Sequence, residues 1–235
     1  METPIYSHLS SKDYDNVYEP AEDTFILLDA LELELPFLKS HKPLVVAEIG
    51  TGSGVVISAL SRYLDYQSFG FYAIDINKFA CDAASRTAKV NNVNVEVLNM
   101  DLLTSFKTNS IDLLVFNPPY VPTDCKSHSN IPEQTKLYDD ESEKVFQKDE
   151  KMLIKSWAGG VDGCEVINRV IFNLNEILAP NGIFYLLLIK DNKPKKIRDQ
   201  LDKLGFNSDQ IIDRKIRGEH LLVLKITRKL AYTLN

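Results

Sequence analysis

The residues best placed to do chemistry are the tetrapeptide Asn117-Pro118-Pro119-Tyr120, which follows the apolar run 111–116. Proline lacks a backbone N–H, fixes its own φ and pushes the preceding residue to extended geometry, so the two prolines end a strand in a stiff loop. The loop presents the Asn117 amide and the Pro118 carbonyl as acceptors beside the Tyr120 ring, which would suit a flat NH2 group. A plain turn that ends a strand is the other interpretation, and the tetrapeptide alone does not choose.

A second candidate site is the glycine loop that follows a buried strand predicted over 44–49. Gly50, Gly52 and Gly54 alternate with Thr and Ser and lead directly into an apolar helical run. Glycines let the backbone turn sharply and approach a ligand closely, and a helix N-terminus offers free N–H groups. Glu48 precedes the first glycine by two residues, where a carboxylate would repel a pyrophosphate and attract a cation. The loop therefore favours a positively charged ligand over a dinucleotide.

Two aspartates follow the next predicted strands. Asp75 ends the strand predicted over 69–74, about 20 residues past the glycine loop, where a carboxylate reaches a ribose diol in nucleotide-binding α/β sheets. Asp101 comes just after a strand predicted over 93–98, where its side chain could meet a bound purine. Aspartates at strand ends are often only solvated surface residues. The spacing favours a ligand role for both, more strongly for Asp75.

The elements that must position these residues alternate along the chain. Residues 18–24 lead into an N-terminal helix, with Pro20 and acidic residues where a helix start favours them, although its carboxylates exceed what one cap needs. Strand and helix then alternate five times, and strands predicted over 209–215 and 220–227 form a terminal antiparallel pair. This order predicts one α/β domain with a Rossmann-like fold: a seven-stranded, mostly parallel sheet, covered on both faces, with an antiparallel C-terminal hairpin.

Three segments fall outside this alternation. Residues 1–17 are polar and without periodicity, which predicts a loosely held N-terminal arm and leaves 18–235 as the domain. Residues 124–155 carry fourteen charges of mixed sign and no glycine, which predicts a flexible or partly helical insertion over the active-site side. Residues 157–163 are glycine-rich and contain the only Trp, and the simplest interpretation is a tight turn before a helix.

Bulk composition narrows the classes of function. Of the 235 residues, 44% are hydrophobic and 26% charged, as in a globular protein. The net charge of −6 argues against general attraction to nucleic acid. Cys81, Cys125 and Cys164 are far apart and in no metal-type spacing, which predicts reduced thiols and no metal site. No apolar run approaches membrane-spanning length, and the N-terminus does not resemble a secretory signal, so we expect a cytoplasmic or nuclear protein.

The motifs together resemble a known family. Glu48 with its three glycines, Asp75 and the Asn-Pro-Pro-Tyr tetrapeptide resemble the class I S-adenosylmethionine-dependent methyltransferases that act on planar nitrogens. Residues 18–24, Tyr-Glu-Pro-Ala-Glu-Asp-Thr, and 157–163, Trp-Ala-Gly-Gly-Val-Asp-Gly, resemble the eukaryotic and archaeal release factor glutamine methyltransferases. The resemblance covers about residues 14–227, and the charged insertion is the main departure from it.

The resemblance implies a cofactor and a role for each motif. Glu48 and the glycine loop would face the methionine part of S-adenosylmethionine, and Asp75 would face its ribose. The implied cofactor-binding residues are Tyr18, Glu22, Thr24, Glu48, Gly50, Gly52, Gly54, Asp75, Asp101, Leu102 and Asn117. The residues implied to hold the acceptor NH2 are Asn117, Pro118, Pro119 and Tyr120. No metal takes part, and no general base is assigned.

The resemblance also implies a substrate and a partner. The substrate would be the side-chain amide of the Gln in the Gly-Gly-Gln loop of the eukaryotic class 1 translation termination factor. The partner would be a small zinc-binding activator subunit, and the strand predicted over 93–98, expected at one edge of the sheet, is open to strand addition.

Three alternatives stay open. An N6-adenine DNA methyltransferase shares the tetrapeptide but should bring a basic groove or a recognition domain, and neither is found in a chain of net charge −6. A lysine methyltransferase would have to deprotonate an ammonium, which the NH2 clamp does not obviously do. A cofactor-fold binding protein without catalysis would be expected to have lost Asn117 or the glycines.

Overall fold

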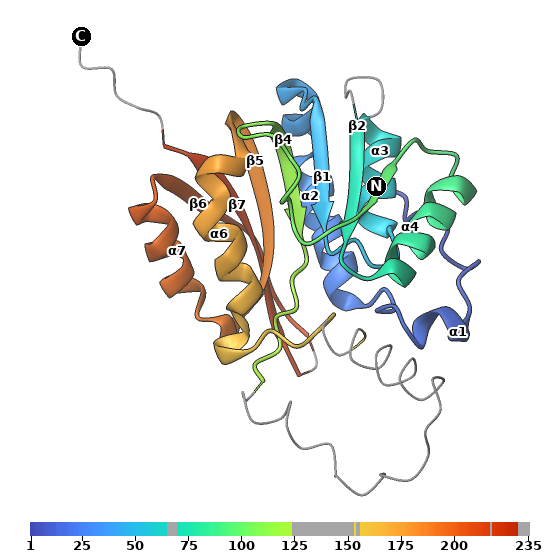
Figure 1. Cartoon of the computed structure of the whole chain (residues 1–235). Coiled ribbons are helices and arrows are strands. Elements are labelled where there is room, and N and C mark those ends of the chain that lie inside the picture. Colours follow the sequence, from blue (N-terminus) through green and yellow to red (C-terminus); the bar gives the residue numbers. More distant parts are fainter. Residues whose placement is uncertain (65–69, 124–152, 154–155, 217, 230–235) are drawn as a thin grey trace, which may run out of the picture.

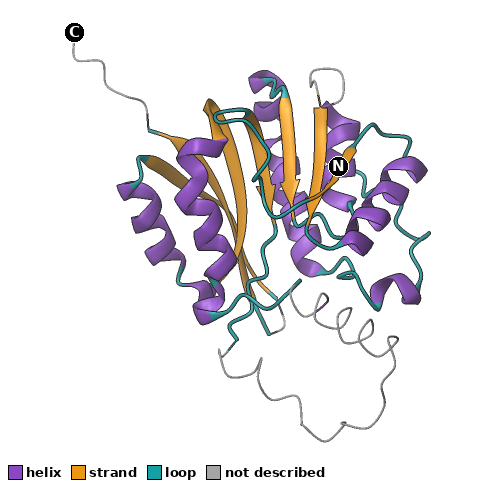
Figure 2. Cartoon of the chain, in the orientation of Figure 1, coloured by secondary structure: helices purple, strands orange, loops and turns teal. Residues whose placement is uncertain are grey.

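The computed structural model describes residues 1–64, 70–123, 153, 156–216 and 218–229. Helices cover both faces of a central sheet (Figures 1 and 2). The helices bounded within the described residues are α1 (Ser11–Tyr14), α2 (Glu22–His41), α3 (Val55–Leu64), α4 (Lys78–Val90), α6 (Glu165–Ile177) and α7 (Pro194–Lys203), with short 3-10 helices at Val161–Gly163 and Lys190–Asn192. The strands are β1 (Val45–Ile49), β2 (Gly70–Asp75), β3 (Glu96–Asn99), β4 (Ile111–Phe116), β5 (Leu178–Ile189), β6 (Phe206–Lys215) and β7 (His220–Arg228).

The sheet has the predicted architecture. Its seven strands run in the order β3-β2-β1-β4-β5-β7-β6. The first five are parallel, and β7 pairs antiparallel with both β5 and β6. The fold class, the C-terminal hairpin and the edge position of the third strand are therefore confirmed. None of the described helices is both long and apolar enough to cross a membrane.

Three strands begin three or more residues away from their predicted starts. Strand β6 begins at Phe206 rather than residue 209. The third strand begins at Glu96 rather than residue 93, because Asn92 takes a left-handed φ of 52° and the Val93 N–H bonds back to the Ala88 carbonyl to close the end of α4. The fifth, which the sequence predicts over 183–189 after a turn at 180–182, begins at Leu178. Ile111 pairs with Leu178, and the next β4 pair is Leu113 with Ile183, so residues 179–182 bulge out of the strand.

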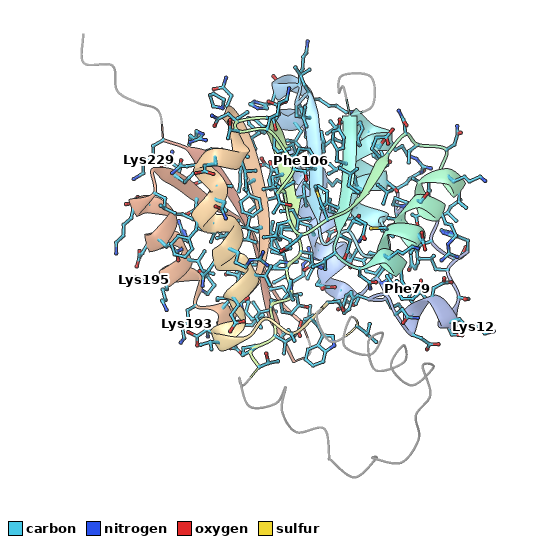
Figure 3. All side chains as sticks on the ribbon, viewed as in Figure 1. Lys12, Phe79, Phe106, Lys193, Lys195 and Lys229 are labelled. Carbon is cyan, nitrogen blue, oxygen red and sulfur yellow. The ribbon has the colours of Figure 1, made fainter. Side chains whose placement is uncertain are left out.

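Alternate residues of the strands build two cores. Val46, Leu113 and Tyr185 are fully buried on the face covered by α2 and α3, and their neighbours Ala47 and Leu114 on the face covered by α6 and α7. This alternation follows from the two-residue period of a strand. In Figure 1 α6 and α7 lie in front of the strands, and the lysines labelled in Figure 3 lie on the outer surface.

The expectation that residues 1–17 are held loosely is wrong. Leu9 and Val17 are buried against Ala80 and Ala83 of α4, whose small side chains leave room for them. The Ile5 N–H donates to the side chain of Asn91 at 2.8 Å, and Asp13 pairs with Arg86. The arm is packed along α4 and leads directly to the start of α2.

Helix α2 is tied to the C-terminal hairpin by charged side chains. Glu34 accepts hydrogen bonds from Lys225 of β7 and, at 2.8 Å, from the hydroxyl of Tyr185 in β5. Asp29 pairs with Arg214 of β6 at 2.6 Å. The first long helix and the last two strands therefore form one unit.

Register brings the predicted site residues to one edge of the sheet. Ile49 of β1 lies opposite Ile74 of β2 and Phe116 of β4. The residues that follow, Gly50, Asp75 and Asn117, consequently leave the sheet side by side at the carboxyl ends of the strands, where open α/β sheets bind ligands.

Candidate active site

A cavity of about 490 Å³ opens at this edge of the sheet, within the usual size range of ligand sites. It is lined from three directions: by the chain entering α2, by the loops after β1, β2, β3 and β4, and by the turn between β6 and β7. The predicted site residues among its lining are Tyr18, Thr24, Glu48, Gly50, Gly52, Asp75, Asp101, Leu102, Asn117, Pro118, Pro119 and Tyr120.

Two predicted cofactor residues do not line the cavity. Glu22 is exposed at the start of α2, and the buried carboxylate that faces the cavity belongs to its neighbour Asp23. Gly54 has a φ of 76°, and a Cβ there would lie 2.6 Å from the backbone of Ala84. This glycine permits close packing of α3 on α4, a structural role in the glycine loop.

The carboxylates of Glu48 and Asp75 hold the glycine loop in place. Glu48 accepts a hydrogen bond from the Thr51 hydroxyl at 2.7 Å and from the Ile57 N–H at 3.1 Å. Asp75 accepts from the Gly52 N–H at 3.1 Å and from the Asn77 N–H at 2.8 Å. A carboxylate oxygen has more than one lone pair, so Asp75 can still accept from a ligand hydroxyl.

Burial raises the pKa of Glu48 from 4.5 to about 8. The folded state therefore binds this proton more tightly than the unfolded chain, and the stability of the wild type should fall as pH rises from about 4.5 to 8, by at most about 1.4 kcal/mol per pH unit. In Glu48→Gln this fall should be absent. Urea unfolding of both proteins across this range measures it, and parallel stability profiles would contradict the assignment.

The tetrapeptide is braced by Asp23, one of the acidic residues of the helix start that exceed what a cap needs, and one that the sequence analysis did not assign to the site. Its Oδ2 accepts from the Asn117 amide Nδ2 at 2.9 Å and from the Tyr120 hydroxyl at 3.1 Å, and its Oδ1 accepts from the Thr24 N–H at 2.7 Å. Because Nδ2 is committed to Asp23, the Asn117 amide turns its oxygen the other way. That Oδ1 is buried and has no hydrogen-bond partner among the described residues.

Two tyrosines complete this end of the cavity. Burial, reinforced by the charge of Asp23, raises the pKa of Tyr18 to about 12 and raises that of Tyr120 further. Both hydroxyls therefore stay protonated at neutral pH. They can donate hydrogen bonds, but neither is present as a tyrosinate that could act as a base.

The glycine-rich segment 157–163 supports the loop from outside. The Val121 N–H donates to the Trp157 carbonyl at 2.9 Å, and the Gly159 N–H donates to the Val121 carbonyl at 2.8 Å. A Cβ at Gly163 would lie 1.9 Å from the Tyr120 carbonyl oxygen. The side chain of buried Asn192 donates to that same carbonyl at 2.8 Å. The segment is thus a backbone support for the tetrapeptide, beyond a tight helix entry.

Gly163→Ala should destabilise the fold by about 3 kcal/mol or more, because the methyl group meets the Tyr120 carbonyl and φ is left-handed at 66°. Gly205→Ala is the matched control: its φ is 88°, but nothing lies within 4 Å of the added Cβ. Unfolding by urea should show the larger loss for Gly163→Ala. Equal losses for the two variants would mean that backbone strain alone sets the cost.

The described lining of the cavity is strongly acidic. Its carboxylates are those of Asp23, Glu48, Asp75, Asp101, Glu165 and Glu219, and its single basic side chain among the described residues is Arg169. Arg169 is already paired with Asp101 at 2.7 Å. The cavity therefore suits a cationic ligand, which would also favour the ionised form of Glu48, and opposes a polyphosphate.

Residues 24–135 match the family model described as the methyltransferase small domain. The chain is 35% identical to the eRF1 methyltransferase catalytic subunit mtq2 of Schizosaccharomyces pombe, over 97% of this chain and 96% of the relative. It belongs to the release factor glutamine methyltransferase family. The human methyltransferase HEMK2 is 34% identical, over 96% of each chain.

A solved structure agrees with this membership. The methyltransferase aligns with a chain of the E. cuniculi Mtq2–Trm112 complex, described as responsible for methylation of the eRF1 translation termination factor, with a TM-score of 0.64. Sequence identity is 28%, and the alignment covers 91% of this chain and 99% of that one. The chain is thus a methyltransferase in fold and in family.

Three residues around the site of this methyltransferase were not predicted from the sequence. Asp23 had a signal, because it stands three and four residues before the buried Ile26 and Leu27 and so falls on the inward stripe of α2. Asn192 and Glu219 had none, since each lies far from the tetrapeptide in sequence and in no recognisable motif. The predicted insertion over 124–155 lies outside the described residues except for Leu153.

Proposed function

We propose that this methyltransferase transfers a methyl group from S-adenosylmethionine to the side-chain amide of the Gln in a Gly-Gly-Gln loop of the class 1 translation termination factor. The observation that carries the proposal is the buried, unpartnered Oδ1 of Asn117, held by Asp23 at the end of β4. An orphaned buried acceptor is costly in a folded protein, so its partner is expected to be supplied by a ligand. An NH2 hydrogen is a suitable partner.

The other residues of the cavity fit the methyl donor. Glu48 and the Gly50–Gly52 loop would hold its methionine part, and Asp75 its ribose. Asp101 and Leu102 lie after β3, where they would face the adenine, and Tyr18 and Thr24 enclose the cavity from the α2 side. The acidic lining matches a cationic sulfonium. When bound, this donor supplies a methyl group already activated by positive sulfur.

The residues of the chain then have to position a weak nucleophile. An amide nitrogen is a poor nucleophile because its lone pair is delocalised into the carbonyl. Asn117 Oδ1 and the Pro118 carbonyl would each accept one hydrogen of the target NH2, and Tyr120 would stack against it. Holding the nitrogen in line with the methyl group and the sulfur makes a bimolecular reaction effectively intramolecular. This can lower the activation barrier by up to roughly 7–11 kcal/mol. Acceptors that bind an NH2 group more tightly as it becomes positive add transition-state stabilisation.

We also propose a heterodimer with a small zinc-binding activator subunit, which the solved Mtq2–Trm112 complex supports. The edge strand β3, Glu96–Asn99, pairs only with β2 among the described strands. Ile76 and Phe79, at the end of β2 and the start of α4, are 48% and 42% exposed and offer apolar surface nearby. An unpaired edge beside apolar side chains favours strand addition. A monomeric chain that is fully active alone would contradict this.

The proposed function also implies a subcellular location. Translation termination takes place in the cytoplasm, and we propose that the protein acts there, with a nuclear pool also consistent with its chemistry. Cys81 and Cys164 are buried free thiols, as a reducing compartment allows.

The test is transfer of labelled methyl from S-adenosylmethionine, with the activator present, to the termination factor and to its variant with the loop Gln changed to Ala. The wild-type factor should be labelled and the variant should not. Equal labelling of the two proteins would show that the methylated group is not the loop Gln. Duplex DNA that contains adenine and a peptide that contains lysine should also be tested. An adenine methyltransferase would label the DNA, and a lysine methyltransferase would label the peptide. The acidic cavity opposes a DNA backbone, and the printed name of the S. pombe relative supports eRF1, a translation termination factor, as the substrate.

A further inference from the structure

The segment that supports the tetrapeptide from outside has an open backbone edge. Val121 and Ala158 form an isolated parallel bridge. In this bridge the Val121 N–H donates to the Trp157 carbonyl, and the Val121 carbonyl accepts from the Gly159 N–H. Successive residues of an extended chain turn their N–H and C=O groups to opposite sides. The N–H and C=O groups of Ala158 therefore point away from Val121, and they form no hydrogen bond with the residues that the structure describes.

This open edge lies beside the tetrapeptide. Trp157 and Ala158 line the cavity together with Pro119. A Cβ at Gly159 would lie 2.4 Å from the Pro119 carbonyl oxygen, so a glycine is needed for the segment to approach this closely. In Figure 1 the segment that precedes α6 lies at the same end of the sheet as the chain that leaves β4. The Ala158 edge is thus fixed next to the residues that would hold the target amide.

Two large apolar side chains of the same segment are open to solvent. Trp157 is 38% exposed and Val161 is 57% exposed. Trp157 also lines the cavity, so its indole ring lies at the border between the cavity and the solvent. A free backbone donor and acceptor beside exposed apolar side chains are the features by which an extended polypeptide binds through strand addition.

We propose that the main chain of the substrate binds along Ala158 as an added strand, while the side chain of its Gln enters the cavity. This inference rests on the proposed function, because it takes the Gly-Gly-Gln loop of the termination factor as the occupant of the edge. A glutamine side chain is short, so its own backbone has to lie close to Asn117 and Pro118 when the amide is bound there. The Ala158 edge, fixed against Pro119, is in that position.

The added strand also explains why glycines should precede the target residue. A glycine has no Cβ, so its backbone can approach the Trp157 ring and the Ala158 edge closely. A bulkier residue next to the target would meet the indole ring before its backbone could pair. The methyltransferase would therefore recognise its substrate through the main chain and through the absence of side chains, in addition to the amide itself.

The direct test is amide hydrogen exchange, resolved by residue over 156–161, in the full chain bound to its activator. Adding the termination factor with S-adenosylhomocysteine, which has no methyl group to transfer, should slow exchange of the Ala158 N–H at least about tenfold. The Gly159 N–H already donates to Val121 and should change less. Equal exchange of the Ala158 N–H with and without the termination factor would overturn the proposal. Protection that is already complete before the factor is added would overturn it as well.

Kinetics of two variants test the same edge. Ala158→Pro removes the free N–H without breaking a described hydrogen bond and should raise KM for the termination factor about 2- to 10-fold. Trp157→Ala should raise it about tenfold. In both variants kcat and the affinity for S-adenosylmethionine should stay near wild type, because these contacts form equally in the ground state and the transition state. Phe172→Ala is the matched control: it removes a 68% exposed ring of α6 outside the cavity and should keep the wild-type KM.

The outcomes separate this inference from the proposed function. Equal labelling of the termination factor and its Gln→Ala variant by the wild type would overturn the proposed function. Labelling that requires the loop Gln, together with an unprotected Ala158 N–H and an unchanged KM in both variants, would overturn the strand addition and leave the function intact. A lower kcat at unchanged KM would reduce the segment to a support for the tetrapeptide and would also overturn the proposal. If Ala158→Pro no longer binds S-adenosylmethionine, hydrogen exchange in the wild type decides.

Discussion

Asn117→Ala should lower kcat for methyl transfer about 10²- to 10³-fold, the range seen when one preorganised hydrogen-bonding group is removed from a reaction centre. Asn117 Oδ1 is a buried acceptor without a partner, so its loss removes an interaction that forms only with the target NH2. The Pro118 carbonyl and the Tyr120 ring remain, which should leave some activity. Single-turnover transfer of labelled methyl measures the effect.

The control for Asn117→Ala is binding of S-adenosylmethionine, measured by calorimetry. Affinity should change less than about tenfold, because the glycine loop and Asp75 are untouched; a factor of ten is about 1.4 kcal/mol. A variant that transfers methyl at the wild-type rate would rule out the tetrapeptide as a clamp. A variant that no longer binds S-adenosylmethionine would show that Asn117 holds the methyl donor rather than the target amide.

Asp23→Ala should reduce kcat by about two orders of magnitude, although Asp23 itself need not touch the substrate. Without its carboxylate, Asn117 Nδ2 and the Tyr120 hydroxyl lose their shared acceptor, and the Asn117 amide is free to turn its oxygen away from the acceptor. Two buried donors left unpaired should also cost about 1–3 kcal/mol each in stability. Urea unfolding and single-turnover kinetics separate the two effects.

Glu22→Gln is the matched control for Asp23. It makes the same change of charge one residue earlier, at an exposed side chain that does not line the cavity, and it should be near wild type. The more conservative Asp23→Asn keeps the side-chain volume but can turn an NH2 group toward the Asn117 amide and the Tyr120 hydroxyl, which are both donors. It should therefore also be slow, but less destabilised than Asp23→Ala. A slow Glu22→Gln with a normal Asp23→Asn would reinstate Glu22 as the functional carboxylate of this helix start.

The parts of the fold that sequence predicted well are those set by local pattern. Strand β4 has the predicted bounds, Ile111–Phe116, because a buried apolar run ends at a residue pair that cannot continue a ladder. The strand order follows from alternating strands and helices with short right-handed connections. The cavity residues Glu48, Asp75 and Asn117 were predictable for the same reason, since each follows a parallel strand at its carboxyl end.

The parts that sequence could not supply depend on docking between distant segments. Which carboxylate at the start of α2 faces inward is decided by how the helix packs, and Glu22 was the wrong choice for the cavity. The packing of Leu9 and Val17 needs the small side chains of α4, which a polar N-terminal composition did not indicate. Glu219 reaches the cavity because β7 runs antiparallel beside β5, which puts the turn between β6 and β7 at the edge of the sheet where β5 ends.

The ion pairs between α2 and the C-terminal hairpin make the order of synthesis matter. The Asn117 orientation needs Asp23 from α2, and α2 is held by Arg214 and Lys225, which the ribosome adds near the end of the chain. A nascent chain that has completed β5 already has the glycine loop and the tetrapeptide, yet not these anchors for α2. Contacts of such long sequence separation form late in folding. Methyl transfer should therefore be gained abruptly with the final hairpin, so that truncated translation products carry the donor motifs without catalytic competence.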